Sequence, residues 1–135
     1  QSTAVATADP RHQVVLLFDA LVRFLHRAEH HLANSDHYEL CQAIVRAQQV
    51  LTALMGALDR RPAPELAQQL FALYNWLHGR LNEVGLTGDP AVLQEALAVA
   101  QRLRDAWQQA EINCCVEANH ASATAPVGGA GHGAS

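Results

Sequence analysis

The chain has 135 residues, enough for one domain and too few for two ordinary ones. Half of the residues are hydrophobic, the net charge is −4, and all nine basic residues are arginines. This balance disfavours a nucleic-acid binder, which needs an excess of cations to displace counterions from phosphates. No apolar run is long enough to cross a membrane, and three cysteines, two of them adjacent, make a poor disulfide framework. We therefore expect a cytoplasmic protein without membrane insertion.

The first predicted helix begins at Asp9 and Pro10. Asp9 can cap free backbone N–H groups, and Pro10 stands where its missing donor costs nothing. The apolar residues that follow are spaced by three and four, which predicts one buried stripe as far as Asn34. This stripe consists of Val14, Phe18, Leu21, Leu25, Ala28 and Leu32.

A second helix is predicted after Ser35 or Asp36, either of which can act as its N-cap. Its apolar residues repeat the same spacing, and they are Leu40, Ile44, Ala47, Leu51, Leu54 and Leu58. Pro62 and Pro64 cannot continue a helix, so we expect a break over residues 60–64.

The third predicted helix ends at Gly85, which we expect to form a left-handed C-cap. Its stripe is Leu66, Leu70, Leu73, Leu77, Leu81 and Val84. Asp89 and Pro90 then repeat the start signal of the first helix. The fourth stripe is Leu93, Ala96, Ala100, Leu103, Trp107 and Ala110, and the pattern fails after Ile112.

Short connections force neighbouring helices to run antiparallel. The sequence therefore predicts an all-α fold, an antiparallel up-and-down four-helix bundle with a disordered C-terminal tail. We place the bundle at residues 1–113 and a flexible Ala/Gly-rich tail at residues 114–135, since the tail has almost nothing to bury.

Two helices carry more apolar residues than one stripe needs. Leu17 and Phe24 lie one heptad apart beside the first stripe, and Phe71 and Tyr74 lie beside the third. Exposed apolar area of this kind often marks a partner surface. The alternative is that these residues are covered by neighbouring helices or by further chain.

Two rival interpretations are a generic dimerising bundle and a metal- or cofactor-binding four-helix bundle. His26 and His30 are four residues apart and could share a metal ion. The carboxylates that a di-metal bundle repeats on other helices are missing, however. No phosphate-binding loop, zinc-protease motif or nucleophile elbow occurs, so we expect no enzymatic activity and no cofactor.

Five short motifs give the chain a resemblance to the flagellar export chaperones for flagellin. In chain order they are TADP at 7–10 with LLFDAL at 16–21, RAQQVL at 46–51, LYNWLHGRL at 73–81, NEVGLTGDP at 82–90 and RLRDAW at 102–107. Each motif is weak alone, but together and in this order they are specific.

The resemblance implies a helical bundle that binds the disordered C-terminal segment of flagellin and presents it to the flagellar export gate. The bound segment is expected to wrap around the bundle and to fold partly into helices, which prevents premature polymerisation. The contact residues are then expected to include Leu17, Phe24, Phe71 and Tyr74.

Overall fold

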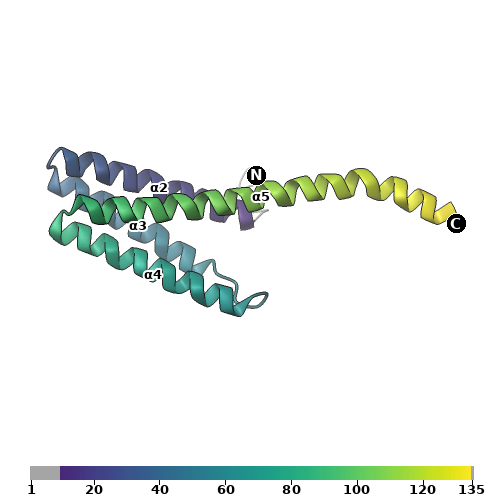
Figure 1. Cartoon of the computed structure of the whole chain (residues 1–135), viewed down its shortest axis with the longest axis horizontal. Coiled ribbons are helices and arrows are strands. Elements are labelled where there is room, and N and C mark those ends of the chain that lie inside the picture. The colour runs from purple at the N-terminus through teal and green to yellow at the C-terminus, as the bar shows by residue number, and fades with distance from the viewer. Residues whose placement is uncertain (1–9, 135) are drawn as a thin grey trace, which may run out of the picture.

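A computed structural model describes the backbone of residues 10–134 and the side chains of residues 10–113 (Figure 1). It contains four helices, which are α2 (Pro10–Ala33), α3 (His37–Gly56), α4 (Pro64–Thr87) and α5 (Pro90–Ala134). No strand occurs in this described part. The predicted all-α class is therefore confirmed.

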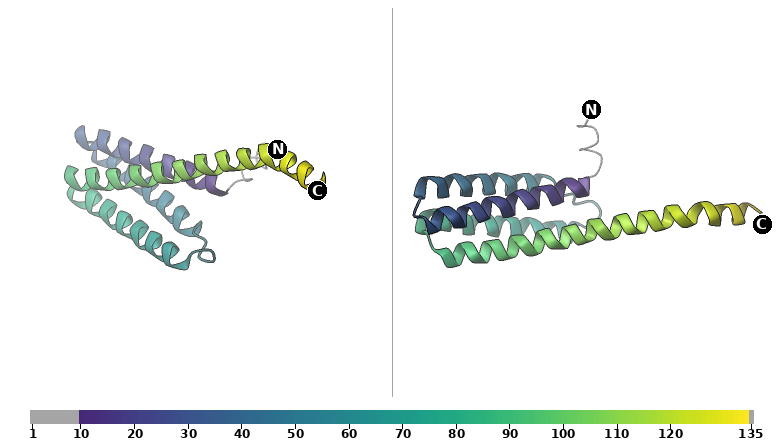
Figure 2. Two further views of the ribbon diagram at one scale, coloured as in Figure 1. Left: turned by 45° about the vertical axis from the view of Figure 1, so that its right-hand side comes forward. Right: turned by 90° about the horizontal axis from the view of Figure 1, so that it is seen from above.

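The four helices form a closed ring in cross-section. Helix α2 packs against α3 and α5, and α4 packs against the same two neighbours. The two views in Figure 2 show that consecutive helices run in opposite directions. This is the predicted up-and-down bundle, in which α2 and α4 are diagonal to each other, as are α3 and α5.

Two of the helix starts use the predicted chemistry. The Asp36 carboxylate accepts a hydrogen bond from the Glu39 backbone N–H, and Asp89 accepts one from the N–H of Ala91. Helix α4 begins at Pro64, where a missing N–H has no consequence. The predicted cap Asp9 lies outside the described residues.

The predicted end of the third helix at Gly85 is wrong. Helix α4 continues to Thr87, and Gly88 adopts the left-handed conformation with φ 66° and donates its N–H to the Val84 carbonyl. Both glycines are compatible with a C-cap by composition. Only Gly88 is placed where the chain must reverse into α5, so the turn geometry selects it.

The core follows most of the predicted stripes. It is apolar throughout the described residues, with no buried polar or charged residue. Its largest fully buried side chains come from all four helices, and they are Phe18, Leu21, Leu25, Leu40, Leu51, Leu54, Tyr74, Leu77, Leu81, Val84 and Leu93. The first half of α4 departs from the prediction, because Ala67 and Tyr74 are buried there instead of Leu66, Leu70 and Leu73.

Helix α5 also departs from the prediction, since its backbone remains helical as far as Ala134 where the sequence predicts a disordered tail. Figure 1 shows this part extending beyond the other three helices. A lack of large apolar residues argues against packing but not against helicity, because alanine has the highest helix propensity. The division into a bundle and a tail at residue 113 stays a prediction.

Candidate partner-binding surface

The bundle opens at the end that carries the loop between α3 and α4. Figure 1 shows the α3–α4 hairpin inclined to α2 and α5, so that this loop lies away from α5. A cavity of about 400 Å³ occupies the opening. Its walls are mainly apolar and come from all four helices and the loop, including Val14, Leu54, Leu58, Leu66, Leu70, Tyr74 and Trp107.

A second, shallow apolar groove lies between α4 and α5. Leu73 on α4 and Val99 and Leu103 on α5 line the groove, with Arg102 at its edge. Leu66, at the first turn of α4, is 53% exposed although it lies on the predicted core stripe. Apolar side chains left open along two adjacent helices are typical of a surface that another protein covers.

Tyr74 forms part of the cavity wall and belongs to the core at the same time. Its side chain is 1% exposed, and its ring lies 6.1 Å from the ring of Phe18, centroid to centroid. Burial raises the pKa of the Tyr74 phenol to about 12, because a phenolate would have to be desolvated there. The phenol is therefore neutral at physiological pH.

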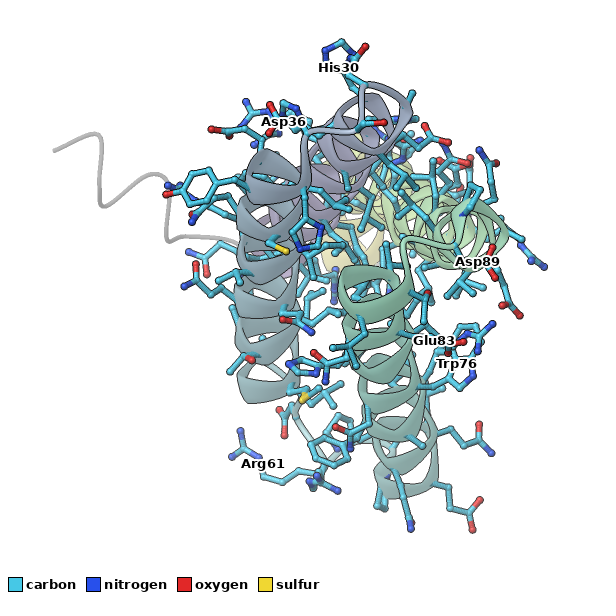
Figure 3. The ribbon with its side chains drawn as sticks, turned by 90° about the vertical axis from the view of Figure 1, so that its left-hand side faces the viewer. His30, Asp36, Arg61, Trp76, Glu83 and Asp89 are labelled. Atoms are coloured by element: carbon cyan, nitrogen blue, oxygen red, sulfur yellow. The ribbon has the colours of Figure 1, made fainter. Side chains whose placement is uncertain are left out.

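An arginine holds α4 to α5 beyond the groove. Arg80 binds Glu83 on its own helix and Glu95 on α5. The hydrogen bond to Glu95 raises the pKa of Arg80 above its ordinary value. The guanidinium also lies 5.8 Å from the ring centre of Trp76, which Figure 3 shows on the side of α4 away from α3. The two helices are thus fixed together at one end of the groove and open toward the other.

A second polar contact joins α2 to α5 at the open end of the bundle. His12 Nδ1 lies 2.7 Å from Glu111 Oε2. The two residues belong to the first turn of α2 and to the last described side chains of α5, so the contact ties together helices on one side of the cavity.

The four residues predicted from the sequence do not share one hollow. Phe24 is partly buried in a hollow between α2 and α3, with Arg27 stacked 5.4 Å from its ring centre. Leu17 is partly buried against the core. Phe71 is half-buried beneath Arg60 of the loop, and Tyr74 is a core residue that reaches the cavity. The prediction that Tyr74 stands beside the core stripe is wrong.

The residues that sequence reasoning missed are those it assigned to the interior. Leu66, Leu70, Leu73, Leu103 and Trp107 all lie on predicted core stripes, yet they line the cavity or the groove. One signal could have found the three leucines on α4. The first half of α4 carries two adjacent apolar lines, and a bundle interior has room for only one of them.

The histidines assigned to a possible metal site have other partners. The His26 ring lies within hydrogen-bond distance of Glu29 and Gln101, and the His30 ring lies near the Asn34 amide. Nowhere in the described residues do three His, Cys, Asp or Glu side chains come close enough to hold a metal ion. None of the described helices combines the length and hydropathy needed to cross a membrane.

Comparison with known proteins identifies the family. The family model described as flagellar protein FliS matches residues 1–113. The flagellar secretion chaperone FliS of Bacillus subtilis is 27% identical over 110 residues, which are 82% of this chain and 81% of that protein. The proteins of the same name from Escherichia coli and Salmonella typhimurium are each 28% identical over 108 residues, covering 79% of this chain and about four fifths of each relative. The chain therefore belongs to the FliS family of flagellar proteins.

Proposed function

We propose that this protein is an export chaperone for flagellin, which binds the C-terminal segment of the unpolymerised subunit in the apolar cavity and the α4–α5 groove. The observation that carries the proposal is the cavity itself, whose apolar walls come from all four helices at the open end of the bundle. The related chaperones support the identity of the process as flagellar secretion.

The apolar surface suits a disordered client. A segment that folds on binding loses several kcal/mol to ordering, about 2–5 in typical cases, so it needs a long apolar surface as compensation. Leu66 in the cavity and Leu73 and Leu103 in the groove supply apolar surface without unfolding the bundle. The resulting affinity is moderate, which lets the chaperone release flagellin at the flagellar export gate in the bacterial cytosol.

We further propose that the client continues around the bundle to the residues that flank α3. Leu17 and Phe24 lie on the α2 side, and Phe71 lies under the loop at the start of α4. An extended segment can contact both sides of the bundle because it spans about 3.3 Å per residue. The role is binding and protection, with no chemical step.

The proposal is tested with a peptide of the flagellin C-terminal segment and calorimetry at several temperatures. We expect one peptide per chaperone and a clearly negative heat-capacity change, because apolar area is buried. Leu66→Asp and Leu73→Asp should each weaken binding by about tenfold or more, since each places a carboxylate in the apolar surface.

Leu86→Asp is the matched control for these variants. Leu86 lies on the same helix and is 87% exposed. It is about 200° around the helix from Leu66, at 100° per residue, so it faces away from the groove. Equal losses for Leu66→Asp and Leu86→Asp would show that the cavity is not the binding site, and equal losses for Leu73→Asp and Leu86→Asp would show the same for the α4–α5 groove.

The contacts beside α3 have their own test. Phe24→Asp and Phe71→Asp should abolish or strongly weaken client binding while helical content and melting temperature stay nearly unchanged. If both variants unfold the bundle instead, these residues serve the interior and the client does not contact them. The result for the α4–α5 groove would then stand independently.

A further inference from the structure

The hollow between α2 and α3 differs chemically from the apolar groove. Phe24, Arg27 and His31 from α2 and Tyr38 and Arg46 from α3 line it, with Glu39 as its single acidic residue. Tyr38 is 68% exposed. The hollow thus combines two guanidinium groups with two aromatic rings.

The two arginines of this hollow lack acidic partners. Among residues 10–113, neither Arg27 nor Arg46 has a carboxylate within ion-pair distance, and Glu39 pairs with neither. Three other arginines are all paired, namely Arg61 with Asp59, Arg80 with Glu83 and Glu95, and Arg104 with Asp19 and Asp105. In a chain of net charge −4, the hollow thus gathers two cations that no carboxylate among residues 10–113 neutralises.

Carboxylates are anionic ligands that such a pair of arginines recognises, and acidic side chains supply them in any protein partner. A guanidinium binds a carboxylate through two parallel N–H donors, and clusters of arginine are a common means of reading acidic motifs. Arg27 is already positioned by the ring of Phe24. The aromatic rings add apolar contacts for neighbouring side chains of a peptide. A nucleic acid is disfavoured, because the rest of the molecule would repel its phosphates.

The hollow lies away from the proposed client groove. It is formed by α2 and α3, whereas the groove is formed by α4 and α5, on the other side of the ring of helices. A client that fills the groove leaves the hollow open, whereas a client that continues as far as Phe24 would compete for it.

We propose that the α2–α3 hollow docks an acidic segment of a second protein partner while flagellin occupies the α4–α5 groove, in place of the client's continuation to Phe24. The docking surface itself rests on the charges and rings of the hollow, and the simultaneous occupancy rests on the proposed function.

The test uses a fluorescein-labelled peptide of alternating glutamate and aspartate with one central leucine, titrated with the full chain in the absence of any client. We expect saturable binding that weakens as salt is raised, because exposed charge pairs are screened. Arg27→Glu and Arg46→Glu should each weaken it by about tenfold or more, since each reverses a charge in the hollow. Both variants leave the cavity and the α4–α5 groove unchanged, so they should weaken flagellin-peptide binding much less than Leu66→Asp does.

Arg102→Glu is the control, because Arg102 is exposed on α5 and has no carboxylate partner among the described residues. It changes the net charge equally but should leave acidic-peptide binding nearly unchanged. Absence of binding by the parent chain, or equal weakening by Arg102→Glu, would overturn the docking surface. Displacement of the acidic peptide by the flagellin peptide would overturn the second partner and assign the hollow to the client. If the flagellin peptide fails to bind, the proposed function is contradicted. The acidic-peptide titration still tests whether the hollow is a docking surface, because it is done without any client.

Discussion

The two halves of α4 carry the same kind of apolar stripe, but the second half is buried and the first half is partly exposed. In the second half, Leu77, Leu81 and Val84 are fully buried. In the first half, Leu66 is 53% exposed, and Leu70 and Leu73 remain partly open. The residue types and the spacing of the two halves are nearly the same.

The difference comes from what surrounds each half. The second half lies where α4 is held to α5 by Arg80 and Glu95 and where all four helices meet. The first half follows the loop with Pro62, where the α3–α4 hairpin diverges from α5. The spacing of apolar residues predicts which side chains share a face of a helix. The neighbouring helices determine whether that face is buried or exposed to water.

The largest expected effect compares one leucine from each half. Leu81→Ala should lower the free energy of unfolding by about 2–5 kcal/mol, because it leaves a cavity in a fully packed layer. Leu66→Ala should cost less than about 1 kcal/mol, because most of that side chain is already in water. Urea unfolding followed by circular dichroism measures both values. Similar losses would mean that the two halves of α4 are packed alike.

A smaller effect on the free energy of unfolding is expected from the ionisation of Tyr74, which belongs to the core and also lines the cavity. Its pKa is raised from 10.0 to about 12, so the unfolded chain releases the phenolic proton at a lower pH than the bundle does. This contribution to stability is complete below about pH 10 and is lost as the pH rises from 10 toward 12. At about 1.4 kcal/mol per pKa unit, the loss is about 2–3 kcal/mol.

Tyr74→Phe is the control for this pH dependence, because it keeps the ring beside Phe18 and removes the ionisable group. The chain has no lysine, so few other groups titrate in this range. Urea unfolding at pH 8 and near pH 11 should show about half of this loss in the parent chain and a much smaller one in the variant. Parallel losses would show that Tyr74 ionises equally in both states.

The smallest expected effect contrasts the two parts of α5. Residues 90–113 pack in the bundle, whereas the part beyond extends past the other helices in Figure 1. Most helical stability in proteins comes from tertiary packing of an apolar face, and the extended part has no neighbouring helix to pack against in Figure 1. Deletion of residues 114–135 should therefore change the free energy of unfolding by less than about 0.5 kcal/mol. In hydrogen-exchange experiments, amides beyond residue 113 should exchange far faster than those of residues 93–103. Strong protection beyond residue 113 would contradict a flexible tail.

Most of the fold could be predicted because its signals are local. Prolines at residues 10, 64 and 90 stand at helix starts, and the capping residues Asp36 and Asp89 directly precede α3 and α5. The spacing of apolar residues predicts four amphipathic helices. These features act within one or two turns of chain, so the sequence contains all the information they need. The family could be recognised for the same reason, since its motifs are short and occur in order.

The candidate surface could not be derived in this way. Leu66 and Leu81 obey the same periodicity, and only the divergence of the α3–α4 hairpin from α5 leaves the first in water and the second in the core. Likewise, Ala67 and Tyr74, one heptad apart, are the residues that the first half of α4 buries, although the predicted stripe passed through the neighbouring leucines. The sequence by itself determined the helices, their order and their family. The tertiary structure alone decided which apolar faces stay open, because coverage depends on residues that are far apart in the chain.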